Sequence, residues 1–207
     1  MSWQLYGVRG WGSVLAEAAL AWVGAPFEFV DVDGFDQPGP ARDRLLEVNP
    51  LARVPTLVGE DRETLTESAA IVLRLAELHP ASGLAPAPGD PLRGAFLNRL
   101  IWFVSVLYPT FTYRDYPERW APDAAGQLTE RIDEFRRSLW LQFESDVGAG
   151  EWVLGERASA LDIYVTAMAR WRPRREWIAA HCPKLHRIAL NAEALPALAP
   201  VMKRNFG

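Results

Sequence analysis

The chain contains a single cysteine, Cys182, among its 207 residues. One cysteine excludes both an internal disulfide framework and a Cys-x-x-Cys redox pair. Because Cys182 precedes Pro183 at a turn between two expected helices, we interpret it as a structural residue rather than a nucleophile.

Long apolar runs and an excess of positive charge are also missing. No apolar run reaches the roughly 18 residues that a membrane helix needs, and no basic segment precedes an apolar one at the N-terminus. We therefore expect a cytoplasmic protein without a membrane partner.

The net charge of −4, from 22 Lys and Arg against 26 Asp and Glu, argues against nucleic acid as a partner. The local cluster of arginines at 170–175 is interpreted as a solvated helix end.

The first third of the chain alternates short strand patterns with helical ones. Strands are expected at 3–7 and 27–32, and a hairpin is expected with one strand at 54–58 and the returning strand at 63–65. Helices are expected at 14–24, 41–48 and 67–78, with Gly24 ending the first. The resulting order, βαβαββα, predicts a mixed α/β sheet flanked by helices, which is the thioredoxin-like order.

The remainder of the chain has only helical periodicity. Four prolines and two glycines between 79 and 91 cannot continue a helix or a central strand, so we expect a linker at 80–91. Apolar residues recur at helical spacing through 92–107 and 123–147. The sequence thus predicts a thioredoxin-like domain over 1–79 and an all-helical domain over 92–207.

Two short motifs in the first domain predict a binding site for a small carboxylate ligand. Val54-Pro55 lies between an approach loop and a short apolar run, where a cis peptide bond is favourable. Glu67-Ser68 opens a helix whose free N–H groups and positive dipole end can bind a carboxylate. Each motif alone is also compatible with an ordinary turn or an ordinary helix start.

In this order and spacing, the segments 49–57 and 67–71 resemble the glutathione-binding half of the cytosolic glutathione transferases. The family pattern is Asn-Pro-x-Gly-x-Val-Pro-x-Leu, a hairpin, then Glu or Gln followed by Ser; Ala52 replaces its glycine here. The resemblance implies glutathione as co-substrate and no metal. It assigns the cysteinyl main chain of glutathione to Val54-Pro55, its α-amino group to Glu67 and its α-carboxylate to Ser68. Arg53 is a further candidate for a ligand carboxylate.

The group that activates the thiol is left open by the sequence. The family uses a Tyr at the end of the first strand, or a Ser or Cys near the first helix. Ser13 is the first candidate and Tyr6 the second, followed by main-chain N–H groups or no activation. Tyr6 is one residue out of register with the tyrosine pattern, and such a slip turns a strand side chain to the other face. Ser13 could instead be the helix N-cap, and Gly12 occupies the position of the family's cysteine.

The resemblance extends to the helical domain, because Ser159 and Asp162 match the capping box that begins its central helix. We interpret that pair as structural. A hydrophobic electrophile would be bound by aromatic residues, and Pro109 is expected to interrupt the helix among them. The candidates are Trp11, Trp102, Tyr108, Phe111 and Tyr113.

The expected function is therefore conjugation of glutathione to hydrophobic electrophiles by a homodimer. The alternatives are a non-catalytic scaffold or ligand-binding protein, and a glutathione-dependent isomerase or reductase. The first loop of the sequence lacks the Ser-Ser-Cys signature of the isomerases. It also lacks the cysteine that a reductase would need there.

Overall fold

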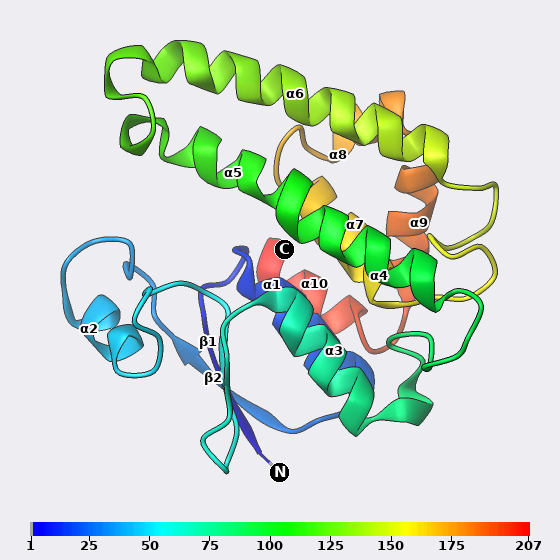
Figure 1. Ribbon diagram of the computed structural model, residues 1–207, viewed down its shortest axis with the longest axis horizontal. Coiled ribbons are helices and arrows are strands. Elements are labelled where there is room, and N and C mark those ends of the chain that lie inside the picture. The colour runs from blue at the N-terminus through cyan, green and yellow to red at the C-terminus, as the bar shows by residue number, and fades with distance from the viewer. Residues whose placement is uncertain (1) are drawn as a thin grey trace. The chain divides into compact units, whose positions relative to one another are not determined.

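A computed structural model describes residues 2–207, which divide into two compact units. The first comprises residues 2–87 together with 192–207, and the second comprises 88–191 (Figure 1). The helix α9 (Pro183–Ala194) begins in the second unit and ends in the first. The predicted domain limits at 79, 80–91 and 92 remain a prediction. Within residues 2–207, no helix is long and apolar enough to cross a membrane.

The first unit is built on a four-stranded mixed sheet in the order β2-β1-β3-β4. Its strands are β1 (Trp3–Gly7), β2 (Phe27–Asp31), β3 (Thr56–Val58) and β4 (Thr64–Leu65). Strands β1 and β2 are parallel, whereas the pairs β1–β3 and β3–β4 are antiparallel. This confirms the predicted thioredoxin-like α/β class.

Helices α1 (Ser13–Val23) and α3 (Ser68–Leu78) pack against each other in this unit, and α10 (Ala199–Phe206) packs on α1 (Figure 1). Helix α1 ends at Gly24, whose φ of 69° is the left-handed conformation that glycine adopts without strain. A separate apolar cluster joins alternate residues of β1 and β2, and the residues that follow them, to Leu45 of α2 (Pro40–Leu46). The short 3-10 turn η1 (Pro80–Ser82) follows α3.

The second unit is helical, as predicted. Its main elements are α4 (Arg93–Trp102), the π-helical segment η2 (Phe103–Leu107), α5 (Tyr108–Asp115), α6 (Ala125–Asp146), α7 (Ala160–Arg170) and α8 (Arg175–His181). Two 3-10 turns, η3 (Pro117–Arg119) and η4 (Pro122–Ala124), lead into α6. Every residue of α7 from Ala160 to Ala169 is buried, which is the property of a central helix.

Pro109 lies in the first turn of α5 and does not interrupt the helical path, contrary to the expectation from the sequence. The π-helical residues 103–107 come immediately before it. An extra residue in the turn shifts the hydrogen-bond register, so the ring and the missing N–H are accommodated while the helix continues.

Candidate functional site

The loop before β3 is held by a buried asparagine. Asn49 is 1% exposed; its Nδ2 donates to the Arg53 carbonyl at 3.1 Å and to Thr56 Oγ1 at 2.9 Å. Its Oδ1 accepts the Leu51 N–H at 3.0 Å, and Thr56 Oγ1 donates to the same Arg53 carbonyl at 2.9 Å. One side chain therefore determines the path of the chain from 49 to 56.

The peptide bond between Val54 and Pro55 is cis, as the sequence predicted. Within residues 2–207, the N–H and C=O of Val54 have no hydrogen-bond partner. The antiparallel register of β1 and β3 pairs Tyr6 with Thr56, so its extension puts Val54 opposite Val8. Val54 thus offers a free donor and acceptor next to the loop that follows β1, as an added strand requires.

Helix α3 begins beside this main chain. Strand β4 pairs Leu57 with Leu65, and extending that register by two residues puts Glu67 opposite Pro55. Glu67 is the N-cap of α3, has an extended backbone and is exposed; its side chain makes no capping hydrogen bond. Ser68, 7% exposed, is the first helical residue. The N–H groups of this first turn have no intrahelical acceptor, so the end of α3 suits a carboxylate.

The two remaining residues of this half differ in exposure. Pro55 is buried below Val54, whereas Arg53 is exposed and engages the loop only through its carbonyl. The guanidinium of Arg53 is therefore accessible to a ligand.

Ser13 is the first residue of α1, and Gly12 is the N-cap, so the alternative role of Ser13 as N-cap is wrong. The Ser13 side chain is fully buried. Its Oγ donates to the Val8 carbonyl at 2.6 Å and accepts the Val8 N–H at 3.0 Å. A hydroxyl carries one hydrogen, so in this arrangement the Ser13 proton is committed to Val8. Ser13 remains a candidate donor to a thiol only if that bond opens.

Gly7 makes this contact possible. A Cβ on Gly7 would lie 2.5 Å from the Ser13 Cβ and 2.8 Å from its Oγ. Only glycine therefore lets the end of β1 approach the start of α1 this closely.

Tyr6 faces the other side of the sheet. Tyr6 is 8% exposed and packs with Val8, Val30 and Leu45 in the apolar cluster, with the Arg44 guanidinium 6.0 Å from the ring centroid. The alternation of side chains along β1 puts Tyr6 and its neighbours Leu5 and Gly7 on opposite faces. Tyr6 is thus part of the apolar core around α2.

Comparison with known proteins identifies the family. Residues 13–83 match the family model described as glutathione S-transferase, N-terminal domain. The uncharacterized GST-like protein YncG of Escherichia coli K12 is 43% identical over 202 residues, which cover 98% of each chain. The chain belongs to the glutathione S-transferase family.

Solved transferase structures share the fold along nearly the whole chain. A glutathione transferase homologue from Sulfitobacter, with bound glutathione, superposes with a TM-score of 0.85 at 26% identity and covers 98% of this chain and 97% of its own. A sphingomonad glutathione S-transferase complexed with glutathione gives a TM-score of 0.80 at 30% identity, with 97% of both chains covered.

In this family member, the aromatic candidates of the second unit fall into separate groups. The Trp102 ring stacks on Phe143, with centroids 5.1 Å apart. Tyr113 meets Trp120 at 4.9 Å. The structure therefore does not bring Trp102 and Tyr113 into one aromatic wall.

Tyr108 and Phe111 form the one group in which two of the predicted residues meet. Their centroids are 6.2 Å apart, and both pack on Trp171, at 5.7 and 5.1 Å. Tyr108 is half-buried, whereas Phe111 is 7% exposed. Trp11, in the first unit, is 40% exposed and lies edge-on to Phe35 at 5.6 Å.

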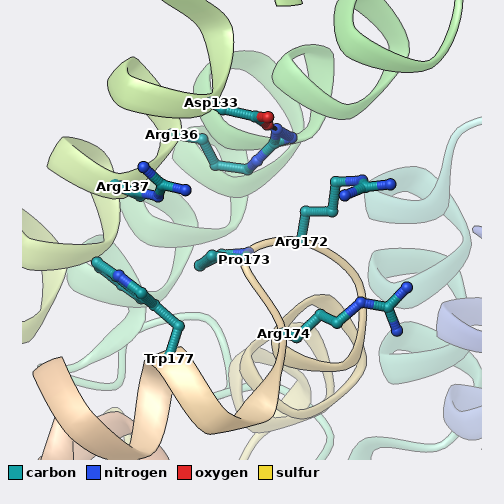
Figure 2. Close-up of a pocket in the computed structure, with 7 residues that line it drawn as sticks. All are labelled: Asp133, Arg136, Arg137, Arg172, Pro173, Arg174 and Trp177. Carbon is teal, nitrogen blue, oxygen red and sulfur yellow. Dashed lines mark hydrogen bonds and ion pairs between the residues drawn. The ribbon is translucent and has the colours of Figure 1, made fainter. Parts of the chain in front are cut away.

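The arginines near residue 172 line a cavity of about 120 Å³ in the second unit (Figure 2). Arg136 is buried there and is paired with Asp133. Figure 2 shows Arg172 and Arg174 extending to one side of Pro173, with Arg137 on the other side. Because these guanidinium groups diverge, they do not form a single oxyanion site. Residues 170–175 join two helices, and exposed Arg172 and Arg174 fit the expected solvated helix end.

The capping box predicted at the start of α7 is present. The Ser159 side chain accepts the Leu161 N–H, and the Asp162 carboxylate accepts the N–H groups of Ser159 and Val153 at 2.7 and 2.8 Å. Complete burial raises the pKa of Asp162 to about 7, against the opposing effect of these hydrogen bonds.

The thiol of Cys182 is a poor nucleophile. Cys182 is buried, and burial together with the nearby Glu144 carboxylate raises the pKa of its thiol to about 12. Residues 2–207 contain no group of three or more His, Cys, Asp or Glu side chains that could bind a metal.

Four residues that hold the main chain around the candidate site were not assigned a role from the sequence. Asn49 is part of the family pattern, but its buried hydrogen bond to Thr56 is visible only in the structure. Glu17 and Asn205, which contact the loop after β1, are 188 residues apart, and no local pattern connects them.

Proposed function

We propose that this family member binds glutathione on its first unit and transfers the thiolate to hydrophobic electrophiles, as a homodimer in the cytoplasm. The observation that carries the proposal is the unpaired main chain of Val54, which lies beside the first turn of α3. Glutathione is an extended peptide with a free α-carboxylate, so it fits an added strand with a carboxylate site at one end.

The assigned contacts follow from that geometry. The cysteinyl N–H and C=O pair with Val54 above Pro55, the γ-glutamyl carboxylate faces the Ser68 end of α3, and the exposed Glu67 accepts the α-amino group. Arg53 is accessible to the other carboxylate. The thiol then lies toward the loop opposite Val54, between β1 and α1.

For the activating group we propose the main-chain N–H groups of Gly12 and Ser13. They lie in the first turn of α1, where the helix supplies no acceptor, and a thiolate is stabilised by such donors and by the dipole. A free thiol of pKa about 8.5 is only a few per cent ionised at pH 7, so lowering its pKa by one unit raises the thiolate fraction about eightfold. The Ser13 hydroxyl remains the alternative donor, since its bond to Val8 would have to open.

Thermal unfolding with and without glutathione tests the binding. Ligand at 100 times its Kd adds about 2.7 kcal/mol to the free energy of unfolding, so millimolar glutathione should raise the melting temperature by several degrees. The Glu67→Gln variant should lose most of this shift, while Glu77→Gln at the exposed end of α3 should retain it. No shift for the unaltered protein would end the proposal.

Conjugation assays with a panel of apolar acceptors test the transfer step. Ser13→Ala should keep the ligand-induced shift; a selective loss of kcat would return the donor role to Ser13. A non-catalytic ligand-binding protein is the second candidate, favoured by the commitment of the Ser13 proton to Val8. Binding without turnover for every acceptor would select it.

The aromatic group of Tyr108, Phe111 and Trp171 is proposed for the acceptor. Trp102 and Tyr113, which pack on Phe143 and Trp120, are not part of this group. Replacing Tyr108 by Leu should change KM for the acceptor and leave the glutathione-induced shift intact.

The homodimer is supported by large apolar side chains exposed on two helices of the second unit. Ile101 of α4 and Phe135 of α6 are each 50% exposed, and Leu141 of α6 is 46% exposed. A second copy would cover them. Light scattering should give twice the chain mass, and Phe135→Glu should reduce it to one chain.

A further inference from the structure

The side chain of Asn205 joins the C-terminal helix α10 to the loop between β1 and α1. Asn205 Oδ1 accepts the Gly10 N–H at 2.9 Å, across 195 positions of the sequence. Its Nδ2 donates to Glu17 Oε2 at 2.8 Å and to the Val201 carbonyl at 2.9 Å. Asn205 therefore joins the loop, α1 and its own helix.

The carboxylate of Glu17 is the common partner of the residues that join α10 to the loop. Its side chain is 1% exposed in the middle of α1, and a buried carboxylate is tolerated only when it is paired and hydrogen-bonded. Arg204 donates to Oε1 from Nη2 at 2.9 Å and from Nε at 3.1 Å, and Arg9 Nη1 approaches it at 3.3 Å. Two residues of α10 and one of the loop thus converge on the same carboxylate.

The loop itself lies close against α10. Gly10 has a φ of 78°, and a Cβ there would lie 3.2 Å from the Asn205 carbonyl oxygen. Gly10 is two residues before Gly12, the N-cap of α1. The position of Gly10 consequently limits where the N–H groups of Gly12 and Ser13 point.

We infer that Asn205 and Glu17 are positioning residues for the thiol site. They hold the loop after β1 so that the N–H groups at the start of α1 face the sulfur of the bound peptide. The inference rests on the proposed function and adds to it a control by the last helix of the chain. Stabilisation of an anion by N–H donors depends on how closely and in which direction they point at it, so a loose loop loses thiolate without losing the ligand.

Asn205→Ala tests the inference, with Lys203→Ala as the matched control, because Lys203 is an exposed residue of the same helix. Hydrogen exchange of the Gly10 amide should accelerate at least tenfold in Asn205→Ala and not in the control. The pKa of the bound thiol, from thiolate absorbance against pH, should rise by about one unit, with a corresponding loss of about tenfold in kcat/KM at pH 6.5. The Kd for glutathione should change less than threefold, because Val54, Glu67 and Ser68 are untouched.

A swap separates positioning from general loss of stability. Asn205→Asp combined with Glu17→Gln exchanges donor and acceptor in this pair while preserving one negative charge beside Arg204. The combined variant should recover most of the pH profile, whereas either change alone should not. Failure of the unaltered protein to bind glutathione would overturn the proposed function and this inference with it. A conjugating protein whose Asn205→Ala profile matches that of Lys203→Ala would overturn this inference alone.

Discussion

Replacing Asn49 by alanine tests whether the loop that presents Val54 is held in advance of ligand binding. The substitution removes three hydrogen bonds, to the Arg53 carbonyl, Thr56 Oγ1 and the Leu51 N–H. Each is worth about 1 kcal/mol net. Leu51 is 64% exposed, so water can replace its bond, and the Arg53 carbonyl keeps its bond from Thr56. We therefore expect a loss of about 2 kcal/mol in the free energy of unfolding.

The energetic cost should be accompanied by a loss of glutathione affinity, because the released loop must be ordered again when the ligand binds. Urea unfolding gives the first quantity and calorimetric titration gives the second. Thr56→Val, combined with Asn49→Ala in a double-mutant cycle, should reveal a coupling of about 1 kcal/mol between these two side chains. Additive costs, or an Asn49→Ala loss below about 0.5 kcal/mol with unchanged affinity, would refute the reasoning.

Three further substitutions follow from the same structure. Ala52 has a φ of 46° and is 3% exposed. Ala52→Gly therefore relieves about 1–2 kcal/mol of strain in the left-handed conformation and loses about 1 kcal/mol from burial of the methyl group. In chemical unfolding, the loss in the free energy of unfolding should be at least 1 kcal/mol smaller for Ala52→Gly than for Ala18→Gly inside α1. Gly7→Ala should cost about 1–3 kcal/mol through its clash with Ser13, and less when Ser13→Gly is also present; equal costs in both backgrounds would contradict the contact. The carboxyl of Asp162 has a pKa of about 7 in the folded state, against 3.8 in the unfolded state. The folded state therefore holds an extra proton between pH 4 and 7, and the free energy of unfolding falls by about 4 kcal/mol as the pH rises through that window. Asp162→Asn should remove this pH dependence from the free energy of unfolding.

The sequence predicted those parts of the fold and site that depend on neighbouring residues. Strand β1 has the predicted bounds, and α1, α3 and α6 begin or end within a few residues of expectation. The cis bond before Pro55 and the capping box at Ser159 are equally local. The bounds of α5 were missed because a π turn at 103–107 accommodates Pro109, and proline usually marks a helix limit.

The surroundings of Ser13 show why the catalytic group could not be assigned from the sequence. A serine beside a helix start is compatible with an N-cap, a donor to a ligand or a bond to the main chain. The choice among them depends on the approach of Val8, which only the absence of a side chain at Gly7 permits. That approach depends on how β1 packs against α1, so it cannot be inferred from Ser13 or Gly7 alone.

The two halves of the proposed glutathione site therefore differ in how they are specified. The binding half is held by contacts over a few residues, such as the three bonds of Asn49 within the segment 49–56. The half that faces the thiol is held by Glu17 and Asn205, across 188 residues. Substitutions of Asn205 or Arg204 in α10 can thus alter the loop after β1 while the contacts around Val54 persist. A protein with this fold can consequently retain the ligand and change what it does to the sulfur, which makes thiol ionisation, more than glutathione affinity, the property to measure.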